Sequence, residues 1–297
     1  MGHGRRIRRS LFASVGLLLA LALAACAGPQ SDWDYANDAG VVADSGFRPE
    51  TDGFAFANYS VGPNRVEFSD GDVRELLGSQ ACTDDDPQTE CELDPRAIAF
   101  RGDAQTLSQG GVCEGLSVLS LLFYSGAADP SQFGAERTPE LQLQNNPELE
   151  REILRWNATQ LTDETINSLR RMSPSQVLAT LEDAWAEPGG PLYTLGLYNR
   201  VEQDLKNGHA VVPYQIESLG NNEALLYIYN SNKPKTPQTI RIDTEAETWR
   251  YQGSNVSYDG SADLELAPVS PRLASALSPR IFADFRNAAQ DAAWACA

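Results

Sequence analysis

The sequence predicts an α+β domain, because helical patterns fill its first two thirds and strand patterns follow in the last third. Three observations carry this prediction. A dense apolar run follows the glycine-rich segment 110–115, apolar residues recur at helical spacing within 138–186, and two β-rich runs, 210–216 and 224–229, flank a turn of Gly and Asn.

The first 25 residues have the pattern of an export signal. Four arginines precede an apolar run, Leu11 to Ala25, which is too short for a confident membrane span and is typical of a signal peptide. The run ends in Leu23-Ala24-Ala25-Cys26, which resembles a bacterial lipobox, so we expect Cys26 to be lipidated. The alternative is an ordinary cleaved signal that happens to contain a cysteine.

Removal of residues 1–25 leaves 297 − 25 = 272 residues with a net charge of −18 − 4 = −22, since the segment holds four Arg and no acidic residue. An apolar content of 42% supports a folded core. The acidic balance argues against nucleic acid and against anionic membrane surfaces as electrostatic partners. We therefore expect membrane attachment through the lipid on Cys26 alone, at the extracytoplasmic side of a bacterial cell envelope.

The expected organisation is a signal peptide (1–25), a flexible tether (26–60) that becomes partly ordered near Phe54, and one domain (61–297). Within the domain, periodicity and turn residues predict a series of helices and strands. In chain order these are a strand at 66–68, a helix at 72–77, a buried helix from Cys113, helices opening at 138, 162 and 173, a helix at 198–206, strands at 210–216 and 224–229, a hairpin of 239–243 and 248–251, and a helical tail at 271–294.

The five cysteines divide by position. Cys82 and Cys91 bracket a short acidic loop, and export permits disulfides, so we expect these two to bond. Cys113 and Cys296 remain, and a disulfide between them would leave no thiol for catalysis. No metal site and no cofactor is expected: residues 26–297 hold a single His and no CxxC pair, and a calcium site at Asp84 to Asp86 is less consistent with the sequence than a solvated acidic loop.

Cys113 stands where a thiol is readily activated. A thiol attacks a carbonyl only as thiolate, and a helix N-terminus together with an imidazole partner lowers its pKa. His209 precedes an apolar strand, and Asn230 follows the next strand, where its side chain can orient the imidazole. Two alternatives stay open: His209 as an ordinary surface or core residue, and Asn230 with Asn232 as a simple turn before Pro234.

Gly110-Gly111-Val112-Cys113-Glu114-Gly115-Leu116-Ser117 resembles the nucleophile segment of papain-like cysteine peptidases, and Gly208-His209-Ala210-Val211 continues the order Cys, His, Asn. The resemblance covers roughly residues 65–260. It implies a helical N-terminal part with the nucleophile helix packed on an antiparallel sheet, and it implies roles for four residues: Cys113 as nucleophile, His209 as general base and acid, Asn230 as orienter and Gln109 as oxyanion donor. The chain has Asn230 where a bacterial and archaeal group with a similar Gly-His-Ala-Val strand usually has Asp.

The resemblance favours an extracytoplasmic thiol hydrolase or acyltransferase that acts on peptide or protein substrates through an acyl-enzyme on Cys113. The alternative is a catalytically inactive papain-like lipoprotein that serves as a surface-anchored binding module. The change from Asp to Asn at 230 and the unusual spacing of the expected oxyanion Gln point toward that alternative.

Overall fold

The structure is a computed structural model of the whole chain. It describes residues 40–62, 65–84, 90–199, 204–253, 257–260 and 264–280, with the side chains of residue 199, of 204–207 and of 257–259 left out. The expected signal segment, Cys26 and Cys296 lie outside the described residues, as does the expected helical tail beyond residue 280. The described residues all belong to one compact unit, 34–297.

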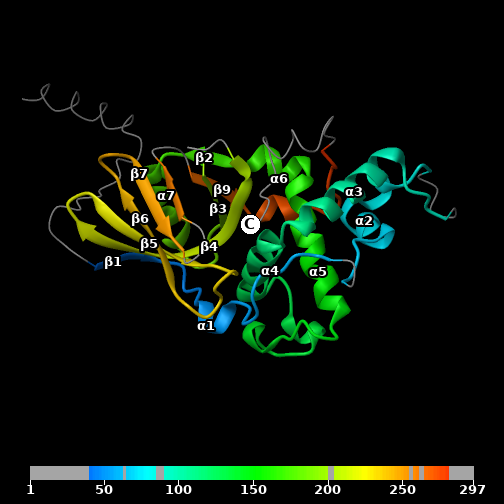
Figure 1. Cartoon of the computed structure of the whole chain (residues 1–297), viewed down its shortest axis with the longest axis horizontal. Helices are drawn as coiled ribbons and strands as arrows, with labels where there is room; N and C mark the ends of the chain where they lie inside the picture. Colours follow the sequence, from blue (N-terminus) through cyan, green and yellow to red (C-terminus); the bar gives the residue numbers. More distant parts are fainter. Residues whose placement is uncertain are drawn as a thin grey trace, which may run out of the picture. The chain divides into compact units, whose positions relative to one another are not determined.

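The first part of the described chain is helical (Figure 1). Side chains cap several of these helices: Ser69 and Asp72 form a capping box at one, and Asp94 and Asn146 accept from the first turns of two others, each followed by Pro. In chain order the helices are α1 (Pro49–Asp52), α2 (Asp70–Leu77), η1 (Gly78–Ala81), α3 (Pro95–Gln109), α4 (Cys113–Ser125), η2 (Pro130–Phe133), η3 (Thr138–Glu140), α5 (Pro147–Ala158), η4 (Thr159–Leu161), α6 (Asp163–Ser168), α7 (Pro174–Trp185) and η5 (Ser270–Leu273).

Helix α4 is the central helix of this part. All of its residues from Cys113 to Phe123 are buried, and it ends at Gly126 in the left-handed conformation, with φ of 73°. One side packs on α5 and the other packs on strand β4 (Asp204–Gly220) (Figure 1). A helix whose apolar residues lie on every side requires such enclosure. The buried helix expected from Cys113 is thereby confirmed.

The second part is a sheet. Within the described residues the strands form one nine-stranded antiparallel sheet in the order β2-β9-β3-β4-β5-β6-β7-β8, with β1 also paired to β4. The chain is thus α+β, as expected. The remaining strands are β1 (Gly40–Asp44), β2 (Arg170–Met172), β3 (Tyr193–Asn199), β5 (Glu223–Tyr229), β6 (Gln238–Asp243), β7 (Thr248–Gln252), β8 (Ser257–Gly260) and β9 (Leu264–Pro268).

Strand β4 lies in the middle of the sheet and joins its two halves. Its first half pairs with β3, where His209 lies opposite Leu197, and its second half pairs with both β1 and β5. The turn to β5 places Gly220, Asn221 and Asn222 at φ of 73°, 53° and 62°. Gly and Asn adopt such angles at low cost, so the expected hairpin is confirmed. The hairpin of β6 and β7 is confirmed as well.

Three expectations about elements differ from the structure, and one helix was not expected. Residues 198–206, expected as a helix, belong to β3 and β4 where they are described, because β3 finds backbone partners in both β4 and β9. No strand forms at 66–68, and the described part of the tail carries only the short helix η5. Helix α3 was not expected: its hydrophobic residues do not follow a clear helical period, although Asp94 and Pro95 give a start signal.

The stretch expected as a tether contributes to the fold from Gly40 onward. Strand β1 pairs with β4, and Phe47 and Phe54 are fully buried, each within a different hydrophobic cluster. Asn58 continues this contact, since its backbone N–H donates to the carbonyl of Ser231 at 2.8 Å. Residues 40–60 therefore pack with the domain whose start was expected at residue 61.

Cys82 and Cys91 form a disulfide, as expected. It closes the acidic loop between η1 and α3. Among the described helices, none combines the length and the apolar character that crossing a membrane requires.

Candidate active site

Cys113 is the first residue of α4 and is fully buried. The turn before it depends on Gly111, whose φ of 129° is a conformation that other residues rarely adopt. The Cys113 sulfur accepts the backbone N–H of Ala210 at 3.3 Å, so the start of α4 contacts strand β4 one residue after His209. The structure therefore brings Cys113 to the strand that carries the imidazole.

The Cys113 sulfur is disulfide-bonded. Cys82 and Cys91 bond each other, so the partner of Cys113 lies outside the described residues. A sulfur in a disulfide is not a nucleophile toward carbonyl groups. The described arrangement is therefore the oxidised form of the site.

His209 and Asn230 form the second part of the site. The Nε2 atom of His209 lies 2.7 Å from Oδ1 of Asn230, and both side chains are buried. Strand β4 supplies His209 and the end of β5 supplies Asn230, so two paired strands set this distance. Asn230, the residue expected to orient the imidazole, is thus in contact with it.

Two further hydrogen bonds determine which nitrogen of the neutral His209 ring carries the proton. The backbone N–H of Asn232 donates to Oδ1 of Asn230 at 2.8 Å, and Nδ2 of Asn230 donates to the Tyr251 hydroxyl at 2.6 Å. The Asn230 amide can therefore face in one direction only, with Oδ1 as the acceptor. The Nε2 atom of His209 must carry the proton in the neutral ring, and Nδ1 keeps its lone pair.

The Nδ1 atom of His209 is buried and makes no hydrogen bond with the described residues. Burial lowers the pKa of His209 from 6.5 to about 4, and the hydrogen bond to Asn230 opposes that shift only in part. The imidazole is therefore neutral near pH 7, and Nδ1 is the atom that can take up a proton. A neutral ring with a lone pair on Nδ1 can accept a proton, but a pKa of about 4 lies well below the operating pH, near which a general base works best.

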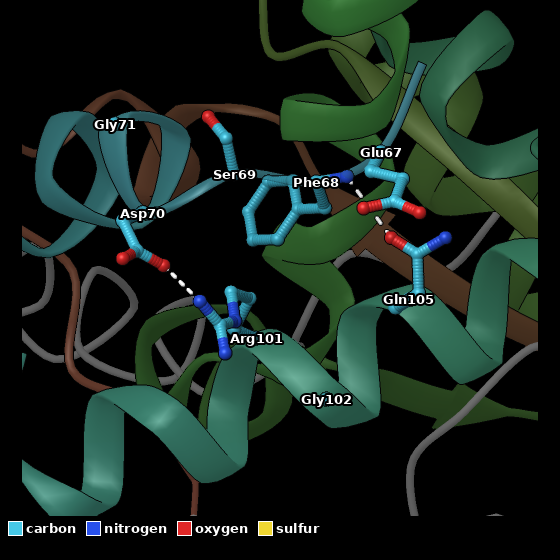
Figure 2. A pocket seen from close by; sticks show the side chains of 8 residues that line it. All are labelled: Glu67, Phe68, Ser69, Asp70, Gly71, Arg101, Gly102 and Gln105. Atoms are coloured by element: carbon cyan, nitrogen blue, oxygen red, sulfur yellow. Dashed lines mark hydrogen bonds and ion pairs between the residues drawn. The ribbon is translucent and has the colours of Figure 1, made fainter. Parts of the chain in front are cut away.

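The expected oxyanion residue is exposed, whereas Cys113, His209 and Asn230 are buried. Gln109 is exposed at the last turn of α3, four residues before Cys113. Gln105, the other glutamine in this stretch, accepts the backbone N–H of Phe68 at 2.9 Å and lines a surface pocket of about 660 Å³ between α2 and α3 (Figure 2). Asp70 and Arg101 pair across the same pocket. Cys113, His209 and Asn230 are not among the residues that line it.

A buried ion pair lies directly behind Cys113 and was not expected. The carboxylate of Glu114 pairs with Arg272 of η5, and both side chains are fully buried. The same carboxylate oxygen accepts from Thr194 of β3 at 2.9 Å, and Arg272 donates to Thr159 at 2.8 Å. The one sequence signal was that Glu114 is the only charged residue of the helix that begins at Cys113.

Gly115 allows α4 and α5 to pack closely. A Cβ at this position would lie 2.2 Å from the carbonyl oxygen of Ile153 and 3.0 Å from Asn157, so glycine is needed for the close approach of α5. The Gly115 N–H donates to Oδ1 of Asn157 at 3.2 Å. The glycine thus fixes helix packing behind the site.

No group of three or more potential metal-binding side chains occurs among the described residues, which include Asp84 but not Asp85 and Asp86. Models of known protein families, curated protein sequences and solved structures give no match to this chain. The chemistry of the site therefore has to be argued from its own residues.

Proposed function

We propose that the chain is a cysteine-dependent hydrolase or acyltransferase that acts outside the cytoplasm, anchored by a lipid on Cys26. Cys113 is the nucleophile, His209 the general base and acid, and Asn230 the residue that orients the imidazole. The observation that carries the proposal is the hydrogen bond from His209 to Asn230, together with the contact of the Cys113 sulfur with the next residue of the same strand.

The single allowed tautomer of His209 supports these roles. With the proton on Nε2, the lone pair of Nδ1 can accept the Cys113 thiol proton. The thiolate then attacks a carbonyl carbon, and the imidazolium returns the proton to the leaving group as the carbon–nitrogen or carbon–sulfur bond breaks. Water or an amine, deprotonated by His209, finally releases the acyl group from sulfur.

This chemistry belongs to the reduced form, since Cys113 is disulfide-bonded in the oxidised one. An external dithiol would have to break that bond by thiol–disulfide exchange, becoming a disulfide itself and leaving two thiols on the chain. The burial of Cys113 adds a condition, because the reductant has to reach a sulfur that is fully shielded.

The resemblance to papain-like cysteine peptidases supplies the substrate class. The order Cys, His, Asn along the chain, and a buried helix that begins at the Cys and packs on an antiparallel sheet, agree with that family. We therefore propose a papain-like fold and an amide bond in a peptide or protein as the substrate. Asn230 in place of Asp means that the imidazolium formed during the reaction has a neutral neighbour.

The test is the pH profile of Cys113 alkylation. The purified full chain is reduced with dithiothreitol and pulsed with iodoacetamide at pH 5 to 9, and labelling of the Cys113 peptide is measured by mass spectrometry. We expect a midpoint below 7.5, against about 8.5 for the same protein unfolded in urea. The variant H209Q should move the folded midpoint toward that reference. Equal midpoints in folded and unfolded wild type would refute the proposal.

The disulfide at Cys113 supports a second candidate function, that of a non-catalytic, surface-anchored binding module. In that case the bond is structural, and reduction should lower the melting temperature without creating a reactive thiol. The same alkylation series separates the two, since an unactivated Cys113 in a destabilised reduced protein supports the module.

A further inference from the structure

We propose that Asn58 is a positioning residue. It holds the loop 110–112, which precedes Cys113, and the turn 230–232, which begins at Asn230, at a fixed separation. This inference rests on the proposed function, because it assigns Asn58 a part in setting the reactivity of Cys113. Asn58 lies in the stretch expected as a tether and is 54 residues before Val112 and 174 before Asn232.

Asn58 bridges two segments that carry the site. Its Oδ1 accepts the backbone N–H of Val112 at 2.9 Å, and its Nδ2 donates to Oδ1 of Asn232 at 3.0 Å. Its backbone N–H donates to the carbonyl of Ser231 at 2.8 Å. Val112 directly precedes the nucleophile, and Ser231 and Asn232 directly follow the orienter.

The bridge continues to the imidazole. The backbone N–H of Asn232 donates to Oδ1 of Asn230, and that same oxygen is the acceptor for His209. A chain of hydrogen bonds therefore runs from the His209 ring through Asn230, Asn232 and Asn58 to the residue before Cys113. Asn232 joins the two halves of this chain, since its backbone N–H bonds Asn230 and its side-chain oxygen bonds Asn58.

Asn58 supplies a hydrogen-bond acceptor at the start of α4. Val112 is the N-cap residue of α4, and its own side chain forms no cap. Its buried backbone N–H depends on Asn58 for an acceptor. Without Asn58 this donor would be left unsatisfied, and the loop 110–112 would be free to shift. A shift of that loop moves the sulfur relative to His209.

The contacts also explain why a side-chain amide is needed. Asn58 must accept at one end and donate at the other, which an amide does and which alanine or a carboxylate does not. Asn232 is exposed, so its link to Asn58 can be broken without opening the core.

The experiment is a double-mutant cycle on the reduced full chain, with N58A, N232A and N58A/N232A, and with N167A as the control. Asn167 is an exposed residue of α6 whose side chain bonds Arg280, away from the chain of hydrogen bonds described above. Each protein is checked for folding by circular dichroism. The readout is the pH midpoint of Cys113 alkylation, which a change in stability alone does not move.

We expect N58A to raise the midpoint by about one pH unit, which corresponds to about tenfold slower alkylation at pH 6. N232A should shift it in the same direction, the double variant no further than N58A, and N167A not at all. If N58A fails to fold, the shift in N232A decides. A wild-type midpoint well below 8.5 that neither N58A nor N232A changes overturns the role of Asn58, and so do additive shifts. A wild-type midpoint near 8.5 overturns the proposed function instead.

Discussion

Replacement of Arg272 by Met tests the buried ion pair behind Cys113. The change removes the guanidinium and keeps an apolar side chain of similar length in a fully buried position. Glu114 keeps only its hydrogen bond from Thr194, and its Oε2 already has no partner among the described residues. Thr159 stays satisfied, because its hydroxyl also donates to the carbonyl of Trp156 at 2.6 Å. The loss of stability in R272M therefore comes from the buried Glu114 carboxylate, which no longer has a cationic partner.

The size of the cost follows from proton linkage. Burial raises the pKa of Glu114, and Arg272 opposes that shift, so R272M raises it further. An acid whose pKa is higher in the folded than in the unfolded state loses stability as pH rises above the unfolded pKa. The penalty is small near pH 4.5 and grows by up to about 1.4 kcal/mol per pH unit for as long as Glu114 stays protonated in the folded variant. Breaking a buried ion pair costs about 3–5 kcal/mol in general.

The assay is urea unfolding of wild type and R272M under non-reducing conditions at pH 5 and pH 7. The double variant E114Q/R272M removes the titrating group, so it should lose the dependence on pH. R241M is the matched control, because Arg241 pairs with Glu223 at the surface, where such pairs contribute about 0–1 kcal/mol. A loss below about 1 kcal/mol for R272M at pH 7, or an equal loss at both pH values, would refute the reasoning.

Four further predictions concern single features. The pKa of His209 is lowered to about 4, so wild-type stability should fall as pH drops from 6.5 toward 4, and H209Q should show a shallower fall in urea titrations. Leu119 is fully buried on α4, so L119A should lower the free energy of unfolding by about 2–5 kcal/mol in urea titrations. A loss under about 1 kcal/mol would mean that α4 is less tightly packed. C82S/C91S should destabilise by about 2–3 kcal/mol in the same assay, or by nothing if the unfolded loop is already compact. Q109A should lower turnover of a peptide substrate by about 10²-fold if Gln109 is the oxyanion donor, with unchanged Cys113 alkylation.

The sequence predicted those parts of the site whose signal is local. The glycine turn and the apolar run after Cys113 predicted a buried helix that begins at the cysteine, because both the turn and the burial leave their pattern within 20 residues. The strands around His209 and before Asn230 were predicted from β-rich runs and a Gly-Asn turn. The contact between the two side chains follows from strand pairing.

The parts that sequence reasoning missed depend on contacts between distant segments. Strand β3 is buried on both sides and pairs with β4 and β9, so its apolar run has no period that separates strand from helix. Asn58 lies among aromatic and small residues in a stretch without clear periodicity, and its contacts become visible only when residues 112 and 232 lie beside it. Glu114 is a charge without a visible partner until Arg272 is placed 158 residues later.

Gly115 has a mechanical consequence for the molecule. Because the carbonyl of Ile153 occupies the space that any side chain at 115 would need, helices α4 and α5 are in direct backbone contact two residues after Cys113. No larger residue fits there without driving the two helices apart. A shift of the segment that begins at Cys113 would therefore have to carry α5 with it or break this contact.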